Sequence, residues 1–225
     1  SDSLITDTRH SLFMLPCGLH QKWIPCMFQI RNANSVDSAA AMSALGDAFE
    51  RDPLMLYLFR DNPEGIRAGI TGFFSILFKA RIELAMPALL LEHDGEVSGV
   101  IMGYDTSRPE WPKAVNDEWH QFEASVPGFA GRLAAYETIC LAHEPKVDHY
   151  YLGVIGVRPS FQGNGAGKAL LDLFCTLSRD DPKSNGVYLE TCNPASLQFY
   201  YNNGFELRGE GRLDQMPLWC VYRRT

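Results

Sequence analysis

The chain has 225 residues, 46% of them hydrophobic and 21% charged, which are the proportions of a globular protein with a sizeable core. Its formal net charge of −7 argues against a nucleic-acid or anionic-membrane partner, because phosphate binding relies on clustered Lys and Arg. No apolar stretch approaches the roughly 20 residues of a membrane span and no secretion signal is recognisable, so we expect a cytoplasmic protein without a membrane partner.

The folded part is predicted to begin near residue 27. Residues 1–26 show no sustained periodicity and are expected to form an irregular N-terminal arm, whereas residues 27–31 (MFQIR) are typical of a short strand. Residues 27–225 are therefore predicted to form one domain.

Two helices are predicted next. Asp37 is expected to cap the first, which runs to about Glu50, and an apolar second helix is expected from Glu64 to Leu84. Four residues of the first helix are spaced to share one face, namely Ala40, Met42, Leu45 and Phe49.

A hairpin and a mixed segment occupy the middle of the chain. Residues 88–91 and 97–104 are predicted to be antiparallel strands, because Asp94-Gly95 between them is typical of a tight turn. Residues 109–145 carry two helical patterns, broken near Pro127-Gly128, and are the expected substrate-facing insertion.

The last third of the sequence alternates between strands and helices. A strand from Tyr150, a glycine-rich turn, a helix over 167–179 and a strand over 187–191 predict one parallel strand pair with a right-handed crossover. The elements expected after this pair are a helix over 195–202 and strands near Phe205 and Trp219.

The glycine-rich turn, residues 162–167 (QGNGAG), opens a helix, so its N–H groups and the helix dipole are suited to a phosphate or pyrophosphate. A Walker loop is disfavoured, because Gln162 replaces its first Gly and Ala169 its Ser or Thr. A dinucleotide fingerprint is disfavoured by the spacing GxGxG. A flexible turn without a ligand is the remaining alternative.

The segment from Arg158 to Gly167 resembles the coenzyme A signature of the GNAT acetyltransferase superfamily, [QR]xxGx[GA], with Gln162, Gly165 and Gly167 in its defining places. The resemblance implies that the amides of residues 162–168 bind the pyrophosphate, while the preceding strand pairs with the pantetheine arm. The residues it assigns to acetyl-CoA or coenzyme A are Ile155, Gly156, Val157, Gln162, Gly163, Asn164, Gly165, Ala166, Gly167, Lys168, Asn193 and Tyr200.

The segment from Asn193 to Phe205 resembles the second GNAT signature, NxxAxxxYxxxGF, with Ser196 in place of the Ala. Together the motifs imply the GNAT fold over about residues 27–224. This α/β (α+β) fold has a mixed, mostly antiparallel sheet of about six to seven strands flanked by helices, with one parallel pair at the acetyl-CoA site. The segments HYYLGVIGV, YLETCNPASLQFY and PLWC are similar to the puromycin acetyltransferase branch.

Tyr200 occupies the position of the family's general acid, which protonates the departing thiolate. A phenol pKa near 10 exceeds a thiol pKa near 8.5, so this transfer is uphill but feasible within a hydrogen bond. A packing role for the ring is the alternative. Tyr201 is expected to point elsewhere, because one residue of helix is a rotation of about 100°. Asn193 is expected near the cofactor arm, as a helix cap before Pro194, or both.

The sequence leaves the general base open, because Tyr151 stands where many family members carry Glu or His. Glu137, Glu144 and His149 are the candidates, each able to act through water. Cys192 offers a covalent route, but a nucleophilic thiolate needs an activating neighbour, and most such cysteines are small core residues. The six cysteines include no CxxC pair, and no metal site is expected.

These features predict an acetyl-CoA-dependent N-acetyltransferase that moves the acetyl group directly from the thioester to an amine. A small-molecule amine is the expected partner, because the insertion over 109–145 is suited to enclosing a pocket. The protein is expected to be a monomer or a homodimer. A non-catalytic acyl-CoA-binding module and a protein or peptide N-acetyltransferase are the alternatives.

Overall fold

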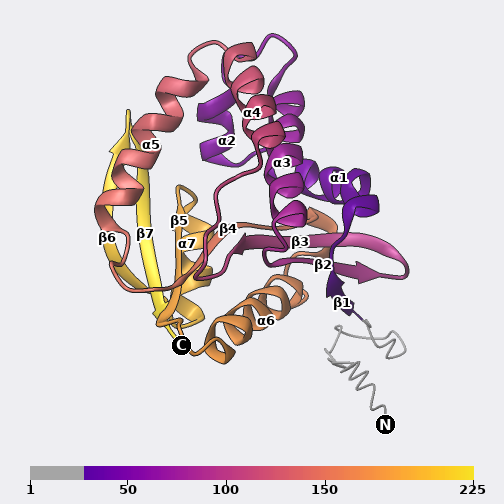
Figure 1. Cartoon of the computed structure of the whole chain (residues 1–225), viewed down its shortest axis with the longest axis vertical. Coiled ribbons are helices and arrows are strands. Elements are labelled where there is room, and N and C mark those ends of the chain that lie inside the picture. The colour runs from indigo at the N-terminus through magenta and orange to yellow at the C-terminus, as the bar shows by residue number, and fades with distance from the viewer. Residues whose placement is uncertain (1–27) are drawn as a thin grey trace, which may run out of the picture.

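The computed structural model describes residues 28–225 (Figure 1), so the predicted arm over 1–26 lies outside the described residues. The strands are β1 (Phe28–Asn32), β2 (Ala88–His93), β3 (Glu96–Tyr104), β4 (Tyr150–Val157), β5 (Gly186–Thr191), β6 (Glu206–Leu213) and β7 (Met216–Arg224). The helices are α1 (Ser38–Phe49), α2 (Pro53–Phe59), α3 (Ile66–Glu83), α4 (Lys113–Ser125), α5 (Phe129–His143), α6 (Ala166–Asp180) and α7 (Pro194–Asn202). The short 3-10 turns are η1 (Ser35–Asp37) and η2 (Pro159–Phe161).

The strands form one seven-stranded sheet of order β1-β2-β3-β4-β5-β7-β6. Only β4 and β5 are parallel, and the other neighbours are antiparallel. The mixed, mostly antiparallel sheet with one parallel pair is thereby confirmed. The predicted β2–β3 hairpin is also confirmed, since Asp94 and Gly95 both have positive φ values (49° and 79°), as a type I′ turn requires.

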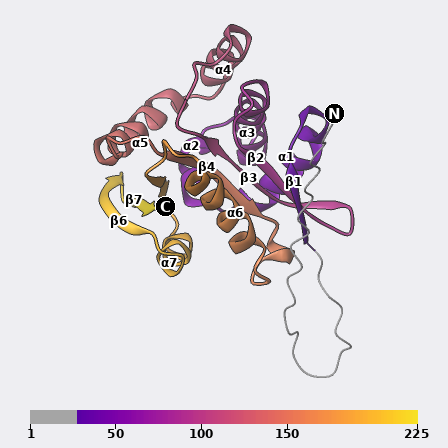
Figure 2. The ribbon, with the colours of Figure 1, turned by 60° about the horizontal axis from the view of Figure 1, so that its bottom comes forward.

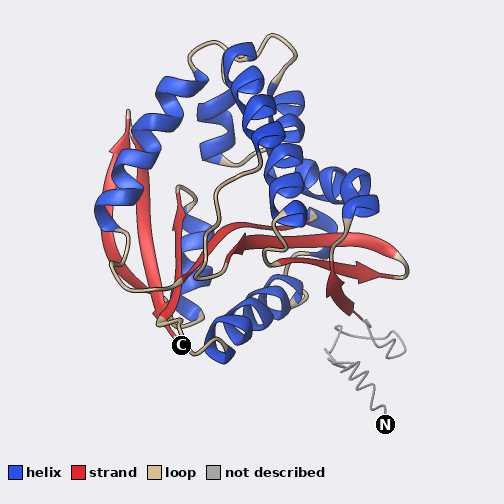
Figure 3. Ribbon diagram, in the orientation of Figure 1, coloured by secondary structure: helices blue, strands red, loops and turns tan. Residues whose placement is uncertain are grey.

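Helices cover both faces of the sheet (Figure 3), and turning the molecule brings α6 in front of β4 (Figure 2). Successive residues of a strand point to opposite faces, so Leu90 packs with α1 and α3, whereas Leu89 packs with α6. The buried residues of α6 recur every three or four positions, as in Leu170 and Phe174. No helix among the described residues is long and apolar enough to cross a membrane.

The start of α1 differs from the prediction. The side chain of Asn34 accepts a hydrogen bond from the N–H of Val36 (3.0 Å), and the side chain of Asp37 accepts one from the N–H of Asn34 (2.8 Å). This reciprocal pair is a capping box that opens the turn η1, so Asp37 makes no side-chain cap bond to α1 itself. The helix face is also shifted, because Ala40 is exposed and Ala41 is buried.

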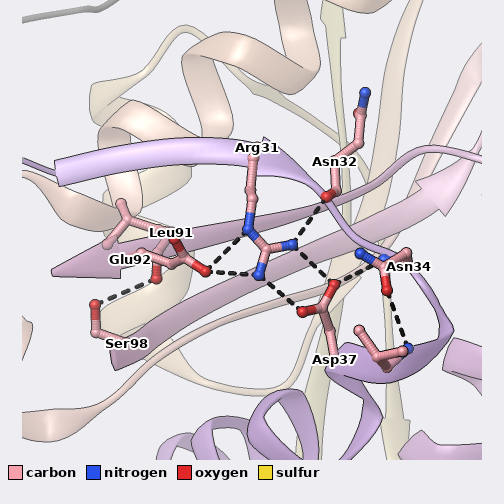
Figure 4. A network of polar contacts seen from close by, with 8 residues as sticks. Arg31, Asn32, Asn34, Asp37, Leu91, Glu92 and Ser98 are labelled. Carbon is pink, nitrogen blue, oxygen red and sulfur yellow. Dashed lines mark hydrogen bonds and ion pairs between the residues drawn. The ribbon is translucent and has the colours of Figure 1, made fainter. Parts of the chain in front are cut away.

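An ion-pair network fastens β1, a strand at the sheet edge, to its surroundings (Figure 4). The Arg31 guanidinium donates to Glu92 on β2 (Nε–Oε1 2.9 Å) and to Asp37 (Nη2–Oδ1 2.7 Å). The hydrogen bond from Arg31 lowers the pKa of Asp37. The network therefore links β1, β2 and the start of α1 through one guanidinium.

Asp37→Asn should destabilise the domain by about 1 kcal/mol, because it removes one charge-assisted pair that is partly shielded from water. A carboxylate whose pKa is lowered by folding stabilises the fold above its unfolded-state pKa, near 3.8, and this contribution is lost as the pH falls through the lower folded-state value. Urea unfolding should therefore separate the two proteins at neutral pH and less so in acid. An equal difference at both pH values would contradict the ion-pair explanation.

Candidate active site

The two parallel strands separate soon after they begin. β4 and β5 are paired only at Tyr150↔Val187 and Tyr151↔Tyr188, whereas β3 pairs with β4 from Tyr151 to Val157, with a register shift at Gly153. The rest of β4 therefore has a free edge on the side of β5.

The backbone amides along this free edge are available for a ligand. Arg158, just after β4, donates its N–H to the Ser98 carbonyl of β3 (2.8 Å). Because N–H directions alternate along a strand of an antiparallel pair, the N–H groups of Val157 and Ile155 point to the free edge. The N–H of Gly156 points the other way, toward β3. On the face of the sheet that α1 covers, a side chain at Gly156 would meet Phe49 of α1. The edge fits an extended chain of amide groups such as a pantetheine arm.

A glycine loop follows β4 and leads into α6. Gly163 and Gly165 have φ values of 79° and 83°, the left-handed region that favours glycine. Ala169 donates the first helical bond, to the Gly165 carbonyl, so the amides of the residues before it have no partner within α6. These amides and the positive end of the helix dipole are suited to binding an anion next to the free edge. The Gln162 side chain donates to the Val157 carbonyl (2.9 Å) and holds the loop on the strand.

Beside the free edge lies a cavity of about 420 Å³. Its walls come from β4, β5, α7 and the helices α2 to α5, so the segment over 109–145 contributes to it. The polar side chains among its lining residues are Asp52, Arg81, Tyr104, Asn116, Tyr136, Glu137, Tyr151, Glu190, Thr191, Ser196 and Tyr200. The remaining walls are mainly aromatic and aliphatic.

Glu190, near the end of β5, is the most perturbed carboxyl group in the cavity. Its Oε2 accepts hydrogen bonds from the hydroxyls of Tyr151 on β4 (3.1 Å) and Tyr136 on α5 (3.2 Å). Burial raises the pKa of Glu190 to about 7, although the two tyrosine hydrogen bonds act in the opposite direction. A carboxyl group with a pKa near neutrality is suited to proton transfer at physiological pH.

Tyr200 lies on α7 in the wall of the same cavity and is 6% exposed. Burial raises the pKa of its hydroxyl, so the phenol stays protonated. Its neighbour Tyr201 is exposed, as the helical rotation predicts. Asn193 is the N-cap of α7, where its side chain accepts from the N–H of Ala195 (3.0 Å), which confirms the capping role.

The three base candidates predicted from the sequence lie in different places. Glu137 lines the cavity, and burial raises its pKa. Glu144 and His149 are not among the lining residues. His149 Nε2 lies 3.3 Å from Glu144 and 2.6 Å from Arg108, and Arg108 also donates to Glu144. The contacts with His149 and Arg108 lower the pKa of Glu144 to about 2. Of the three candidates, Glu137 alone lines the same cavity as Tyr200.

Cys192 also lines the cavity, but it is a weak nucleophile there. It is 3% exposed, and burial raises the pKa of its thiol to about 12, so almost none is thiolate at neutral pH.

Cys192→Ala should therefore retain activity within about threefold of the parent, because direct attack on a thioester needs no acyl-enzyme. Steady-state rates and mass spectrometry of the Cys192 peptide during turnover test this. An acetylated peptide together with an inactive variant would establish the covalent route.

Glu190 and Arg81, two charged residues of the cavity, were not predicted as site residues. Glu190 lies near the end of a largely apolar strand pattern, YLET. A carboxyl group at such a position was the sequence signal that could have indicated a site residue. Arg81 stands at the end of an apolar helix, where its burial depends on packing against distant segments.

A strand edge opening beside a glycine loop at a helix N-terminus is the arrangement expected of a coenzyme A-dependent acyltransferase. The sequence profile of the acetyltransferase (GNAT) family matches residues 57–205 of the chain. The chain belongs to this family, and it is an N-acetyltransferase that uses acetyl-CoA as the donor.

Solved structures share this fold at low sequence identity. The structure from Corynebacterium glutamicum described as histone acetyltransferase HPA2 and related acetyltransferase is 23% identical, with a TM-score of 0.65 over 87% of this chain and 95% of that one. The polyamine N-acetyltransferase of Drosophila melanogaster, which forms N-acetylagmatine, is 15% identical, with a TM-score of 0.62 over 88% and 100% of the two chains. The PaiA N-acetyltransferase of Thermoplasma acidophilum, solved with coenzyme A, is 12% identical, with a TM-score of 0.55 over 88% and 99%.

Gly165→Glu should lower coenzyme A affinity by roughly 10-fold or more, because a carboxylate would compete with the pyrophosphate at the helix N-terminus. Calorimetric titration with coenzyme A measures this without turnover. Gly95→Glu is the matched control, since Gly95 also has positive φ but lies in the β2–β3 turn. Unchanged affinity in a folded Gly165 variant would contradict the assignment of the loop.

Proposed function

We propose that the protein acetylates the amine of a small molecule held in the 420 Å³ cavity, with Glu190 as the general base and Tyr200 as the general acid. The observation that carries this proposal is the position of both residues in the wall of one cavity beside the free edge of β4. Acetyl-CoA supplies the thioester-bound acetyl group, held by the β4 edge and by the amides of residues 162–168.

Glu190 is suited to receive the proton of the acceptor amine. An alkylammonium has a pKa around 10.4, so it must lose a proton before it attacks. The ionised Glu190 carboxylate is held by Tyr136 and Tyr151 and accepts that proton directly or through water. Glu137, on the same cavity wall, is the second candidate for this role.

Tyr200 is placed for the opposite transfer. Burial raises the pKa of its hydroxyl, so the group holds its proton at neutral pH and donates it to the departing thiolate in an uphill step within a hydrogen bond. No hydrogen bond ties this hydroxyl to another side chain or carbonyl within residues 28–225, so it is free to face the cavity. The ring packs edge-on against Phe199 and at a tilt against Phe205, which fixes its direction.

Two features favour a small acceptor over a protein. The cavity has a volume of about 420 Å³ and is bordered by Trp119 of α4 and Tyr136 of α5, dimensions that suit a small molecule. The Drosophila enzyme with the same fold acts on a small amine, agmatine. The resemblance to the puromycin acetyltransferase branch concerns ancestry and leaves the acceptor open, and we propose a monomer or homodimer as the working assembly.

The test is acetyl-CoA turnover, followed by thiol release, against amines, amino acids, aminonucleosides, polyamines and peptides. Turnover confined to small amines would support the proposal. Coenzyme A binding with no turnover would identify a binding module, and turnover confined to peptides would identify a protein acetyltransferase.

A further inference from the structure

The cavity contains one cationic side chain, Arg81, whose charge is not balanced by a neighbour. Arg81 lies in the last turn of α3 and is 3% exposed. Its Nε is buried and has no hydrogen-bond partner. Nη1 reaches the Leu77 carbonyl only at 3.4 Å, and no carboxylate among residues 28–225 lies within ion-pairing distance.

The surroundings hold the guanidinium in place without neutralising it. Its central carbon lies 4.1 Å from the ring centroid of Tyr104 and 5.9 Å from that of Trp111. Gly153 of β4 leaves room beside it, since a Cβ there would be 3.5 Å from Nη2 of Arg81. Arg81, Tyr104, Trp111 and Gly153 all line the cavity.

A buried charge is costly unless it is paired, and a guanidinium offers planar N–H pairs that match a carboxylate. Nε and Nη2 lie on one edge of the group, and neither donates to another residue in the described part of the chain. We propose that Arg81 binds a carboxylate of the acceptor substrate, so that the acceptor is an aminocarboxylate. This inference rests on the proposed function, because it places the acceptor in the cavity.

The charges along the cavity match such a molecule. Glu190 and Glu137 suit the ammonium group, Arg81 suits the carboxylate, and Tyr151 stands between, with its hydroxyl on Glu190 and its ring beside Gly153. The aromatic walls, which include Trp111 and Trp119, accommodate an apolar body. A polyamine would place a second cation near Arg81, which like-charge repulsion disfavours.

The experiment compares paired ligands that differ only in the carboxylate: phenylalanine with phenethylamine, and 4-(aminomethyl)benzoate with benzylamine. Binding is followed by tryptophan fluorescence, which needs no turnover, and kcat/KM is measured in parallel. The parent should prefer at least one carboxylate member by roughly 10-fold or more. Arg81→Met should abolish that preference while leaving affinity for the plain amine within about threefold.

Two further variants separate recognition from general effects. Lys79→Met removes a positive charge from the same helix outside the cavity and should keep the preference. Arg81→Lys keeps the positive charge but lacks the planar guanidinium, so it should keep only part of the preference for the carboxylate ligand. The inference is overturned if the parent binds the plain amines as well as or better than their partners, a result that needs no folded variant. Binding of carboxylate ligands without turnover of any amine would instead reject the proposed function.

Discussion

Replacing Glu190 with Gln should lower kcat/KM for an amine acceptor by roughly 10²- to 10⁴-fold, the usual range for loss of a general base. The amide keeps the shape and can still accept hydrogen bonds from Tyr136 and Tyr151, but it cannot take a proton. The matched control is Glu137→Gln, another carboxyl group in the cavity, which should reduce the rate far less. The opposite ranking would assign the base to Glu137.

The pH dependence gives an independent reading of the same group. The pKa of Glu190 is about 7, so the parent's kcat/KM should fall as the pH drops below that value, and this limb should be absent in Glu190→Gln. Tyr151→Phe removes a hydrogen bond that favours the ionised carboxylate, so the limb should move to higher pH. A limb that stays in place in both variants would belong to another group.

Glu190→Gln should also increase the free energy of unfolding in alkaline solution. A carboxyl group whose pKa rises on folding from 4.5 to about 7 stabilises the fold below the lower value, and this contribution is lost as the pH rises through the higher one. Well above pH 7 the parent therefore buries a charge that Gln lacks, worth roughly 3 kcal/mol. If Glu190→Gln is slower yet more stable than the parent at pH 8, its loss of activity comes from the missing proton acceptor and not from unfolding.

Tyr200→Phe should lower turnover by roughly 10²-fold while coenzyme A affinity changes little, because only the hydroxyl is removed. If Tyr200 protonates the leaving thiolate, the high-pH limb of the turnover profile should also change when chemistry limits the rate. Tyr201→Phe, one residue away and exposed, is the control and should behave like the parent. Equal turnover of the Phe and Tyr forms across pH would mean that the thiolate leaves unassisted.

Most elements of the fold follow from local patterns. The glycine loop, the Asp94-Gly95 turn and the strand over β4 depend on neighbouring residues, and all are found where predicted. α2 has a clear start, since the side chain of Asp52 accepts from the N–H of Leu54 (3.0 Å) and Pro53 follows. It was missed because a seven-residue apolar helix has too few turns to show a periodicity.

The site divides between local and tertiary signals in the same way. The Gln162–Lys168 loop and Tyr200 belong to contiguous motifs, which single segments can reveal. Burial raises the pKa of Glu190, and its two hydrogen-bond partners, Tyr151 and Tyr136, stand 39 and 54 positions earlier in the chain. Its proposed role therefore depends on the β4–β5 neighbourhood and on the path of α5, which no local pattern specifies.

Because β4 and β5 separate, successive backbone amides of β4 should exchange their hydrogens with solvent at two different rates. The N–H groups of Ile155 and Val157 face the free edge and need no opening of the sheet to exchange with solvent, whereas those of Gly156 and Arg158 face β3 and exchange only when that pairing opens. A ligand along the edge slows exchange at the first two amides and not at the others. Four consecutive positions would thus report occupancy of the proposed cofactor site in the absence of any reaction.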